Sequence, residues 1–224
     1  MVTEGTQIEP RGQGYAWTPG IHSPAQIEGW KKVTRAVHAK GSIIFAQLWH
    51  VGRVSHTSLQ PNQAQPIAPS AITATNVKVF IETGPGEGAL ADPSEPRALS
   101  TEEVGELVAM YAQAARNALE AGFDGVELHC ANGYLVNQFI SEHSNTRDDQ
   151  YGGSLTNRLR FLKEVVAAVS EVVGADRLGV RFAPLFASTD DTRVYLGLVE
   201  ADPHHTYMEA IKVLEQAGIA YLSI

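Results

Sequence analysis

GVELHCANGY, residues 125–134, is a short apolar run that leads directly into polar side chains. Gly125 to Leu128 is typical of a buried strand, and His129, Asn132 and Tyr134 follow at its carboxyl end. A polar group that is buried without a hydrogen-bond partner costs free energy. Packing of the core alone therefore poorly explains polar residues at the end of an apolar strand. We interpret His129 to Tyr134 as the reactive centre of a parallel α/β barrel, because such barrels carry their active sites at the carboxyl ends of strands.

The rest of the chain alternates between helix and strand signals. Each predicted helix begins at a capping residue and ends before a glycine. The predicted helices run from Ser23-Pro24 to Gly41, from Ser100 to Gly122, from Thr156 to Val173 before Gly174, and from Asp202-Pro203 to Gly218. The apolar run after each helix predicts a buried strand: Ile43 to Trp49, Gly125 to Leu128, Leu178 to Phe182, and Ala220 to Ile224. Strands that alternate with helices in this way pair in parallel through right-handed crossovers.

The apolar residues of each helix recur at helical spacing, which predicts the face that packs on the sheet. The residues expected on the inner face of the first helix are Ile27, Trp30, Val33 and Val37.

Two observations favour a barrel over an open doubly wound sheet. No Gly-x-Gly-x-x-Gly motif follows any predicted strand, which weakens the dinucleotide-binding alternative. Gln47, His129 and Arg181 each stand at or near the carboxyl end of a different apolar strand, where barrels place their functional groups. We therefore expect an α/β fold of the (β/α)8 TIM barrel class. Only four complete strands and a strand end at Met1 to Thr3 are found, so the barrel is expected to be incomplete, from about the end of its second strand through its sixth.

A long stretch rich in proline and glycine separates the first predicted strand from the second helix. It runs from His50 to Leu99 and contains the turn-rich segment Thr83 to Gly88. Loops of this length in compact domains are commonly lids or binding loops. We therefore expect residues 1–224 to form a single partial barrel domain with an inserted capping region around residues 50–99.

Composition limits the classes of partner. The net charge of −8 comes from 25 acidic and 17 basic residues without a basic cluster, which argues against nucleic acid and anionic membranes as partners. The single cysteine, Cys130, excludes an internal disulfide and is typical of a reducing compartment. Apolar runs such as Leu107 to Ala112 are too short to span a membrane, and the N-terminus lacks a signal-peptide pattern. A cytoplasmic protein with a small-molecule substrate is expected, either a monomer or a homo-oligomer.

Several motifs resemble the old yellow enzyme family of flavin-dependent ene-reductases, particularly its bacterial members of the N-ethylmaleimide reductase type. The resemblance covers essentially all 224 residues. The motifs that carry it are Thr3-Glu-Gly-Thr-Gln-Ile8, Gly12-Gln-Gly-Tyr15, Gln47-Leu-Trp-His-Val-Gly-Arg53, His129-Cys-Ala-Asn-Gly-Tyr134 with the residues to Phe139, the segment Asn145 to Arg158, and Val180-Arg-Phe-Ala-Pro184.

The resemblance implies an FMN-dependent oxidoreductase that takes hydride from NAD(P)H and reduces activated C=C bonds of α,β-unsaturated carbonyl or nitro compounds. His129 and Asn132 match the family's pair that binds the substrate oxygen, and both can donate hydrogen bonds as negative charge develops there. Tyr134 matches the proton donor, and its phenol suits the role of general acid.

The resemblance also implies contacts with the cofactor. Arg181 carries a planar cation and Gln47 offers both a donor and an acceptor, which suits the edge of a flavin ring. Gly5 corresponds to backbone that lies close to the flavin, and Trp49 and Tyr15 resemble the aromatic walls of the substrate pocket.

Simpler interpretations of the same residues remain. Gln47 and Arg181 could form a structural pair across the barrel, and Arg147 to Asp149 could be a charged loop. We interpret Cys130 as buried packing, because successive residues of an extended segment point to opposite faces and Cys130 cannot easily pair with His129. No metal site is expected, since the spacing of the other histidines matches none and they are interpreted as solvated: His50, His56, His143, His204 and His205.

Two alternative functions remain open beside the flavin-dependent one. One is a non-catalytic fragment that does not hold FMN by itself, because an open set of strands leaves unpaired edges. The other is a metal-dependent barrel hydrolase that uses the histidines.

Overall fold

The centre of the molecule is a five-stranded parallel sheet with the strand order β1-β2-β7-β8-β9. The structure, a computed structural model, describes residues 1–184 and 200–224. The strands of this sheet are β1 (Val2–Gln7), β2 (Phe45–Trp49), β7 (Gly125–His129), β8 (Leu178–Arg181) and β9 (Tyr221–Ser223). Parallel pairing is the arrangement that the alternation of helices and strands predicts, and the order follows the chain as in a barrel wall.

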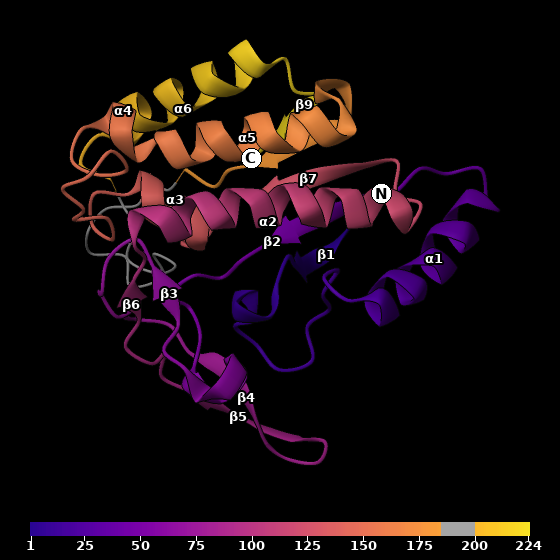
Figure 1. The fold of residues 1–224 in the computed structure, drawn as a ribbon, viewed down its shortest axis with the longest axis horizontal. Helices are drawn as coiled ribbons and strands as arrows, with labels where there is room; N and C mark the ends of the chain where they lie inside the picture. The colour runs from indigo at the N-terminus through magenta and orange to yellow at the C-terminus, as the bar shows by residue number, and fades with distance from the viewer. Residues whose placement is uncertain (185–199) are drawn as a thin grey trace.

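Helices connect successive strands and cover one face of the sheet. The long helices of the described residues are α1 (Pro24–His38), α2 (Thr101–Glu120), α5 (Arg160–Val173) and α6 (Pro203–Ala217). In Figure 1, α2, α5 and α6 lie side by side across the sheet, and α1 lies beyond α2 on the side of β1. The predicted caps are present: Ser23 and Ser100 each form a capping box, with Gln26 and Glu103 respectively.

The remaining elements are short. They are α3 (Leu135–Ile140), α4 (Leu155–Arg158), and the 3-10 helices η1 (Pro10–Gly12), η2 (Thr57–Leu59), η3 (Pro61–Gln63) and η4 (Ala175–Arg177). Two small sheets complete the described part of the chain, β3 (Ile67–Ala68) with β6 (Arg97–Ala98), and the hairpin of β4 (Val79–Gly84) with β5 (Glu87–Ala91).

Several details of the elements differ from the sequence prediction. The strand end predicted at Met1 to Thr3 is part of a complete strand, β1, whose polar residues hide the pattern because its first half is largely exposed. Val33 lies on the outer face of α1 and is 41% exposed, so its assignment to the inner face was wrong. The third helix is split into α4 and α5 at Leu159, where the buried Arg158 donates hydrogen bonds to the backbone oxygens of Ile140 and Gly153.

The main core lies between the sheet and the helices. Alternate strand residues such as Leu48, Leu128 and Val180 are fully buried there with Leu107 and Tyr111 of α2. The intervening residues point to the opposite face, which in a barrel is the interior. The sheet therefore divides its side chains into an apolar set under the helices and a largely polar set on the other face.

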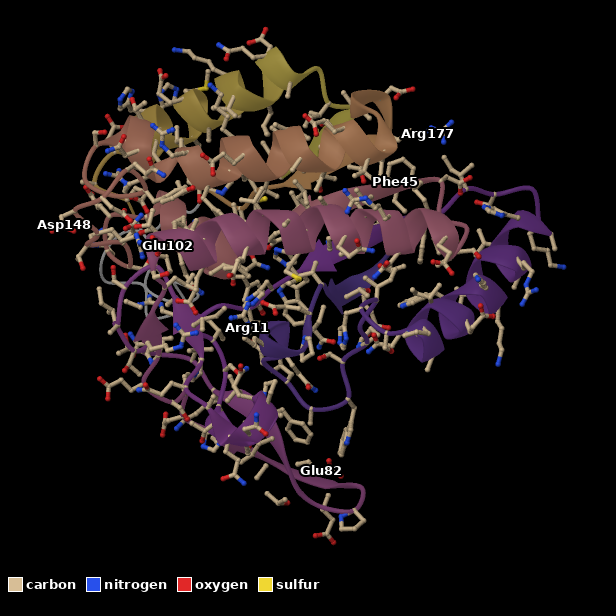
Figure 2. The ribbon with its side chains drawn as sticks, viewed as in Figure 1. Arg11, Phe45, Glu82, Glu102, Asp148 and Arg177 are labelled. Atoms are coloured by element: carbon tan, nitrogen blue, oxygen red, sulfur yellow. The ribbon has the colours of Figure 1, made fainter. Side chains whose placement is uncertain are left out.

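Register places this second set in two rows. Gly5, Gln47, Glu127, Gly179 and Tyr221 are successive partners across the five strands, and we call them the lower row. His129, Arg181 and Ser223 are partners nearer the carboxyl ends, and we call them the upper row. Figure 2 shows the two ends of the wall: Phe45 and Arg177 mark the amino ends of the strands, and Glu102 and Asp148 lie at the other end.

The segment between β2 and α2 contacts the carboxyl ends of the strands. Val79 of β4 is fully buried in a second apolar cluster with Val51, Trp49 and Tyr134. The β4–β5 hairpin extends away from the body of the molecule at the bottom of Figure 1. The role of this region as a cap over the barrel mouth stays a prediction, and its packing on Trp49 and Tyr134 agrees with it.

The capping box of α2 gives a prediction for stability. The Ser100 hydroxyl accepts a hydrogen bond from the Glu103 amide at 3.2 Å, and the Glu103 carboxylate accepts one from the Ser100 amide at 2.9 Å. We expect Ser100→Ala to lower the free energy of unfolding by about 1 kcal/mol, the usual value of an N-cap. Urea unfolding followed by circular dichroism measures this change. Ser42→Ala, at an exposed position outside any helix, is the control and should have almost no effect.

Candidate active site

The carboxyl ends of β2, β7 and β8 meet at one edge of the sheet, and the predicted site residues gather there. β7 lies between β2 and β8, which places His129 beside Arg181 in register and directly beyond Glu127 along its strand. The Trp49 ring lies 6.2 Å from the His129 ring, centroid to centroid. Three strand ends thus supply the floor and the polar groups of one site.

His129 is held as a neutral hydrogen-bond donor. Its side chain is 5% exposed, and burial together with the positive charge of Arg181 lowers its pKa to about 4. Its Nδ1 accepts a hydrogen bond from the amide of Ala131 at 3.3 Å. An imidazole whose Nδ1 accepts carries its proton on Nε2. His129 therefore presents an uncharged N–H group at neutral pH.

The residues after His129 form a tight turn. Asn132 and Gly133 both have left-handed backbone conformations, with φ of 56° and 74°, and the Tyr134 amide donates to the Ala131 oxygen at 3.2 Å. Asparagine followed by glycine is the pair that best tolerates two successive left-handed residues. The dipeptide Asn132-Gly133 is thus explained by the turn, which reverses the chain and returns Tyr134 toward His129.

Aromatic rings enclose the site. The Tyr134 ring lies edge-on to both His129 and Trp49, with centroid distances of 5.0 Å in each case. The Tyr15 ring stacks on Trp49 at 6.0 Å, and the Tyr15 and Tyr134 hydroxyl oxygens are 3.2 Å apart. The structure therefore brings together Tyr15, Trp49, His129 and Tyr134, as the sequence analysis predicts, while the roles given to them stay predictions.

One interpretation of Gln47 and Arg181 was that they pair with each other across the barrel. The structure describes both residues and shows no hydrogen bond between their side chains. The Gln47 amide nitrogen donates instead to a Glu127 carboxylate oxygen at 2.6 Å, and both side chains are buried. Arg181 is half-buried in the upper row, where its charge acts on His129. Both residues point into the barrel interior, where a flavin contact would require them.

Gly5 makes room for Trp49. A Cβ atom at position 5 would lie 2.7 Å from the Trp49 ring, closer than real contacts allow. The glycine is therefore required where the indole crosses β1. This contact explains why position 5 is a glycine, and the sequence analysis did not anticipate it. The close approach of Gly5 to the flavin stays a prediction.

Two further residues hold the turn that carries Tyr134, and the sequence analysis missed both. The Gln138 amide donates to the backbone oxygens of Val51 and Gly133 at 2.9 and 2.8 Å. The Asn137 side-chain oxygen accepts from the Gly133 amide at 2.8 Å. Both side chains are buried, and two adjacent polar residues on the first turn of a buried helix are the signal that could have revealed them.

Cys130 and His50 belong to neither row, although the Cys130 amide donates a hydrogen bond to the backbone oxygen of Arg181 at 3.0 Å. Cys130 is fully buried, as predicted, and burial raises the pKa of its thiol. His50 was wrongly expected to be solvated: it is fully buried and lies 3.3 Å from a Glu9 oxygen. Residues 1–184 and 200–224 contain no group of three or more histidine, cysteine or acidic side chains that could hold a metal ion.

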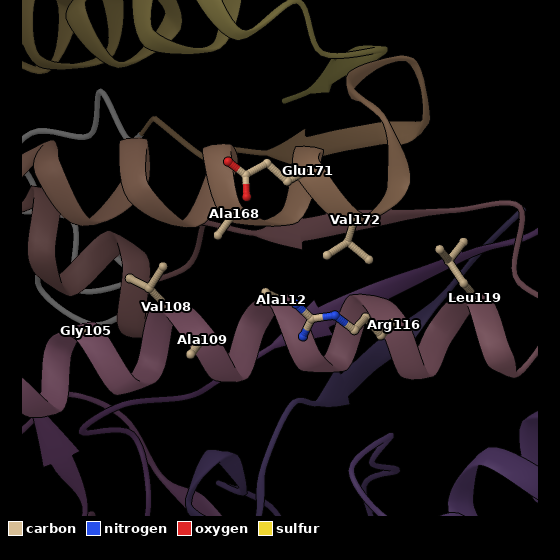
Figure 3. A pocket seen from close by; sticks show the side chains of 9 residues that line it. All are labelled: Gly105, Val108, Ala109, Ala112, Arg116, Leu119, Ala168, Glu171 and Val172. Carbon is tan, nitrogen blue, oxygen red and sulfur yellow. The ribbon is translucent and has the colours of Figure 1, made fainter.

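A separate hollow of the described surface lies elsewhere. It is an open groove of about 680 Å3 between α2 and α5, on the outside of the helical layer. Figure 3 shows it lined by small and apolar side chains, with Arg116 and Glu171 as its charged members. It contains none of the predicted site residues.

Comparison with known proteins agrees with the fold and identifies the family. The sequence model of the NADH:flavin oxidoreductase / NADH oxidase family matches residues 1–222. 12-Oxophytodienoate reductase 7 of Oryza sativa subsp. japonica is 43% identical over 229 residues, which is 100% of this chain and 56% of that protein. The structure of morphinone reductase in complex with tetrahydroNAD is 48% identical with a TM-score of 0.92, and the match covers 99% of this chain and 59% of that one.

A second solved structure, the old yellow enzyme homologue from Zymomonas mobilis, is 39% identical with a TM-score of 0.89, over 99% of this chain and 58% of that one. The strand order, the helical layer and the polar strand ends define part of an α/β barrel. The chain belongs to the NADH:flavin oxidoreductase / NADH oxidase family, and the resemblance to old yellow enzymes is confirmed. It spans a little over half the length of the relatives quoted above. In the described residues, no helix is both long enough and apolar enough to cross a membrane.

The electrostatics of His129 can be tested directly. We expect the His129 imidazole to titrate with a midpoint near pH 4, and we expect Arg181→Gln to raise that midpoint, because removing a nearby positive charge favours the imidazolium. NMR of the histidine rings as a function of pH measures both values. Arg116→Gln, in the outer groove, is the charge-matched control and should leave the midpoint unchanged.

The same shift has a consequence for folding. The pKa of His129 in the folded protein lies below the ordinary value of 6.5, so the unfolded chain takes up the proton first. His129 therefore reduces stability as the pH falls below 6.5, until the folded protein is also protonated near pH 4. A His129 midpoint near 6.5 would contradict this account of the site.

Proposed function

We propose that the protein is an FMN-dependent oxidoreductase of the ene-reductase type, which uses NAD(P)H to reduce activated C=C bonds. The observation that carries the proposal is the neutral, buried N–H donor of His129 beside the phenol of Tyr134, under the aromatic wall of Trp49. The family to which the chain belongs is one of flavin-dependent oxidoreductases. The motifs resemble those of bacterial N-ethylmaleimide reductases, and α,β-unsaturated carbonyl or nitro compounds are the substrates that this resemblance implies.

The residues present fit a flavin. The inner face of the strand ends offers Arg181 as a cation and Gln47 as a combined donor and acceptor, which suits the polar edge of the ring system. The indole N–H of Trp49 is buried and has no hydrogen-bond partner among the described residues. Buried donors are seldom left unpaired, so this one agrees with a bound group in the site. Gln47, Arg181 and the backbone at Gly5 would hold the flavin.

When bound, FMN supplies the hydride that reaches the β-carbon of the substrate. The protein's own groups act on the rest of the molecule. His129 and Asn132 donate hydrogen bonds to the carbonyl or nitro oxygen, where negative charge increases during hydride transfer. Because the low pKa of His129 keeps it neutral, it stabilises that charge as a hydrogen-bond donor and retains its proton.

Tyr134 completes the reaction by donating its phenolic proton to the α-carbon. The turn at Asn132-Gly133 and the side chains of Asn137 and Gln138 fix its backbone. Tyr15, whose hydroxyl oxygen lies 3.2 Å from that of Tyr134, is placed to contact the same phenol. A positioned general acid of this kind contributes a factor of about 100 to 10,000 to a rate.

Replacing the proton donor separates the two half-reactions. We expect Tyr134→Phe to slow reduction of 2-cyclohexenone by about 100-fold or more, because the general acid is lost. Reduction of the flavin by NADPH needs no proton from Tyr134 and should stay near normal. Stopped-flow absorbance at the flavin band measures each half-reaction separately.

The control is Tyr151→Phe, because the Tyr151 hydroxyl binds Glu164 on α5 and lies outside the site. It should leave both half-reactions close to those of the unchanged protein. If Tyr134→Phe affected neither step, the role assigned to Tyr134 would be wrong.

Cofactor binding distinguishes this function from its two alternatives. We expect the purified protein to quench the fluorescence of added FMN and to shift its absorbance band, and Arg181→Gln to weaken that binding by about tenfold through loss of a charged hydrogen bond. A colourless protein that leaves the FMN spectrum unchanged would support a non-catalytic fragment. Bound zinc or another metal, found by elemental analysis in a protein without flavin, would support a hydrolase.

A further inference from the structure

The proposal concerns Glu127, a buried carboxylate in the lower row to which neither the motifs nor the proposed chemistry gives a role. Its side chain is 4% exposed and lies between Gln47 and Gly179 in the register of the sheet. The Gln47 amide nitrogen donates to it at 2.6 Å, a short distance typical of a charge-assisted hydrogen bond. No ion pair with a Lys, Arg or His is formed by Glu127 within residues 1–184 and 200–224.

Placing a carboxylate with only uncharged partners in the interior of a barrel is energetically unfavourable. Burial of a charge without a paired cation costs free energy that an apolar side chain in the same position would avoid. Burial raises the pKa of the Tyr221 phenol on β9, and the negative charge of the nearby Glu127 carboxylate raises it further. Gly179, between them in the register, leaves the space for the Tyr221 ring, since a Cβ there would lie 2.2 Å from it.

We propose that Glu127 is a positioning residue that fixes the orientation of the Gln47 amide toward the flavin. A glutamine amide can turn over by 180° and exchange its oxygen and nitrogen with little change of shape. A carboxylate accepts hydrogen bonds and cannot donate them, so Glu127 faces the nitrogen of Gln47 and repels its oxygen. The Gln47 oxygen and the second N–H of its amide are then directed elsewhere in a single arrangement.

This arrangement determines which hydrogen bonds Gln47 can offer. With one N–H engaged by Glu127, the amide presents one acceptor and one donor, and their order is fixed. The imide part of a flavin ring alternates an N–H donor with carbonyl acceptors, so only one order matches it. The inference rests on the proposed flavin binding. It adds that Glu127, by orienting Gln47, makes the amide of Gln47 complementary to the imide part of the flavin.

The first test reads the amide itself and needs no flavin. In protein labelled with 15N at glutamine, we expect one Gln47 side-chain proton to resonate at unusually low field, because it is bound to a carboxylate. Glu127→Met, of similar volume but without an acceptor, should abolish this shift, and Gln47→Ala assigns the signal. An ordinary Gln47 resonance that Glu127→Met leaves unchanged overturns the proposal.

The second test measures FMN binding in a double-mutant cycle. We expect Glu127→Met to raise the dissociation constant of FMN by about tenfold in the otherwise unchanged protein, as for loss of a hydrogen bond to a charged group. In the Gln47→Ala background the same substitution should change it by less than about twofold, because its effect passes through Gln47. An equal effect in both backgrounds overturns the proposal.

Two further variants test the need for an exclusive acceptor and control for folding. Glu127→Gln presents an N–H donor as well as an oxygen acceptor to Gln47, so it no longer fixes the order of the amide and should bind FMN more weakly than the unchanged protein. Binding equal to that of the unchanged protein would show that an exclusive acceptor is not needed and would contradict the proposal. Glu106→Met, at an exposed position of α2, is the matched control and should leave binding unchanged. Thermal unfolding monitors the folding of every variant. If the unchanged protein binds no FMN, the proposed function fails, and the Gln47 resonance still decides the orientation of the amide.

Discussion

The parallel register of β2, β7 and β8 is the constraint on which the site depends. Because side chains of a strand alternate between faces, one register decides which residues enter the interior and which enter the core under the helices. It sets Gln47 beside Glu127 and His129 beside Arg181. A slip of one residue would move these polar groups into the apolar core, where Leu48, Leu128 and Val180 lie, so core packing and site geometry enforce the same pairing.

The same register explains why His129 is neutral. It lies at the end of a buried strand, where desolvation disfavours its charged form, and its partner across the ladder is the cation Arg181. The lower row has the opposite charge, since Glu127 is one layer below both residues. The site is therefore arranged in two layers, with Glu127 beside Gln47 in the lower row and Arg181 beside His129 in the upper row. The low pKa of His129 follows from its burial and from the neighbouring cation.

The sequence predicts the parts of the structure that local chemistry controls. The caps at Ser23 and Ser100, and the helix ends before glycines, are encoded within a few residues and are confirmed. β1 escapes prediction beyond its first residues because its hydrogen bonds come from β2 and its own side chains are partly polar and exposed. Burial of His50 escapes it for a similar reason, because the partner of that histidine, Glu9, lies 41 positions away in the chain. The polar pair Asn137-Gln138 on a buried helix signals a role, but the backbone partners of Gln138 at Val51 and Gly133 are set by the fold and cannot be read from the sequence.

Trp49 connects the barrel wall with the region above it. It belongs to β2, yet its ring packs in the cluster that includes Val79 of the β4–β5 hairpin and lies against Tyr15, His129 and Tyr134. This ring occupies the space that the missing side chain of Gly5 leaves over β1. A movement of the hairpin that displaces Val79 therefore changes the packing of the Trp49 indole. The indole in turn contacts the rings of His129 and Tyr134. Packing on a single residue thus couples the region between β2 and α2 to the groups proposed for catalysis, without direct contact between the hairpin and His129 being required.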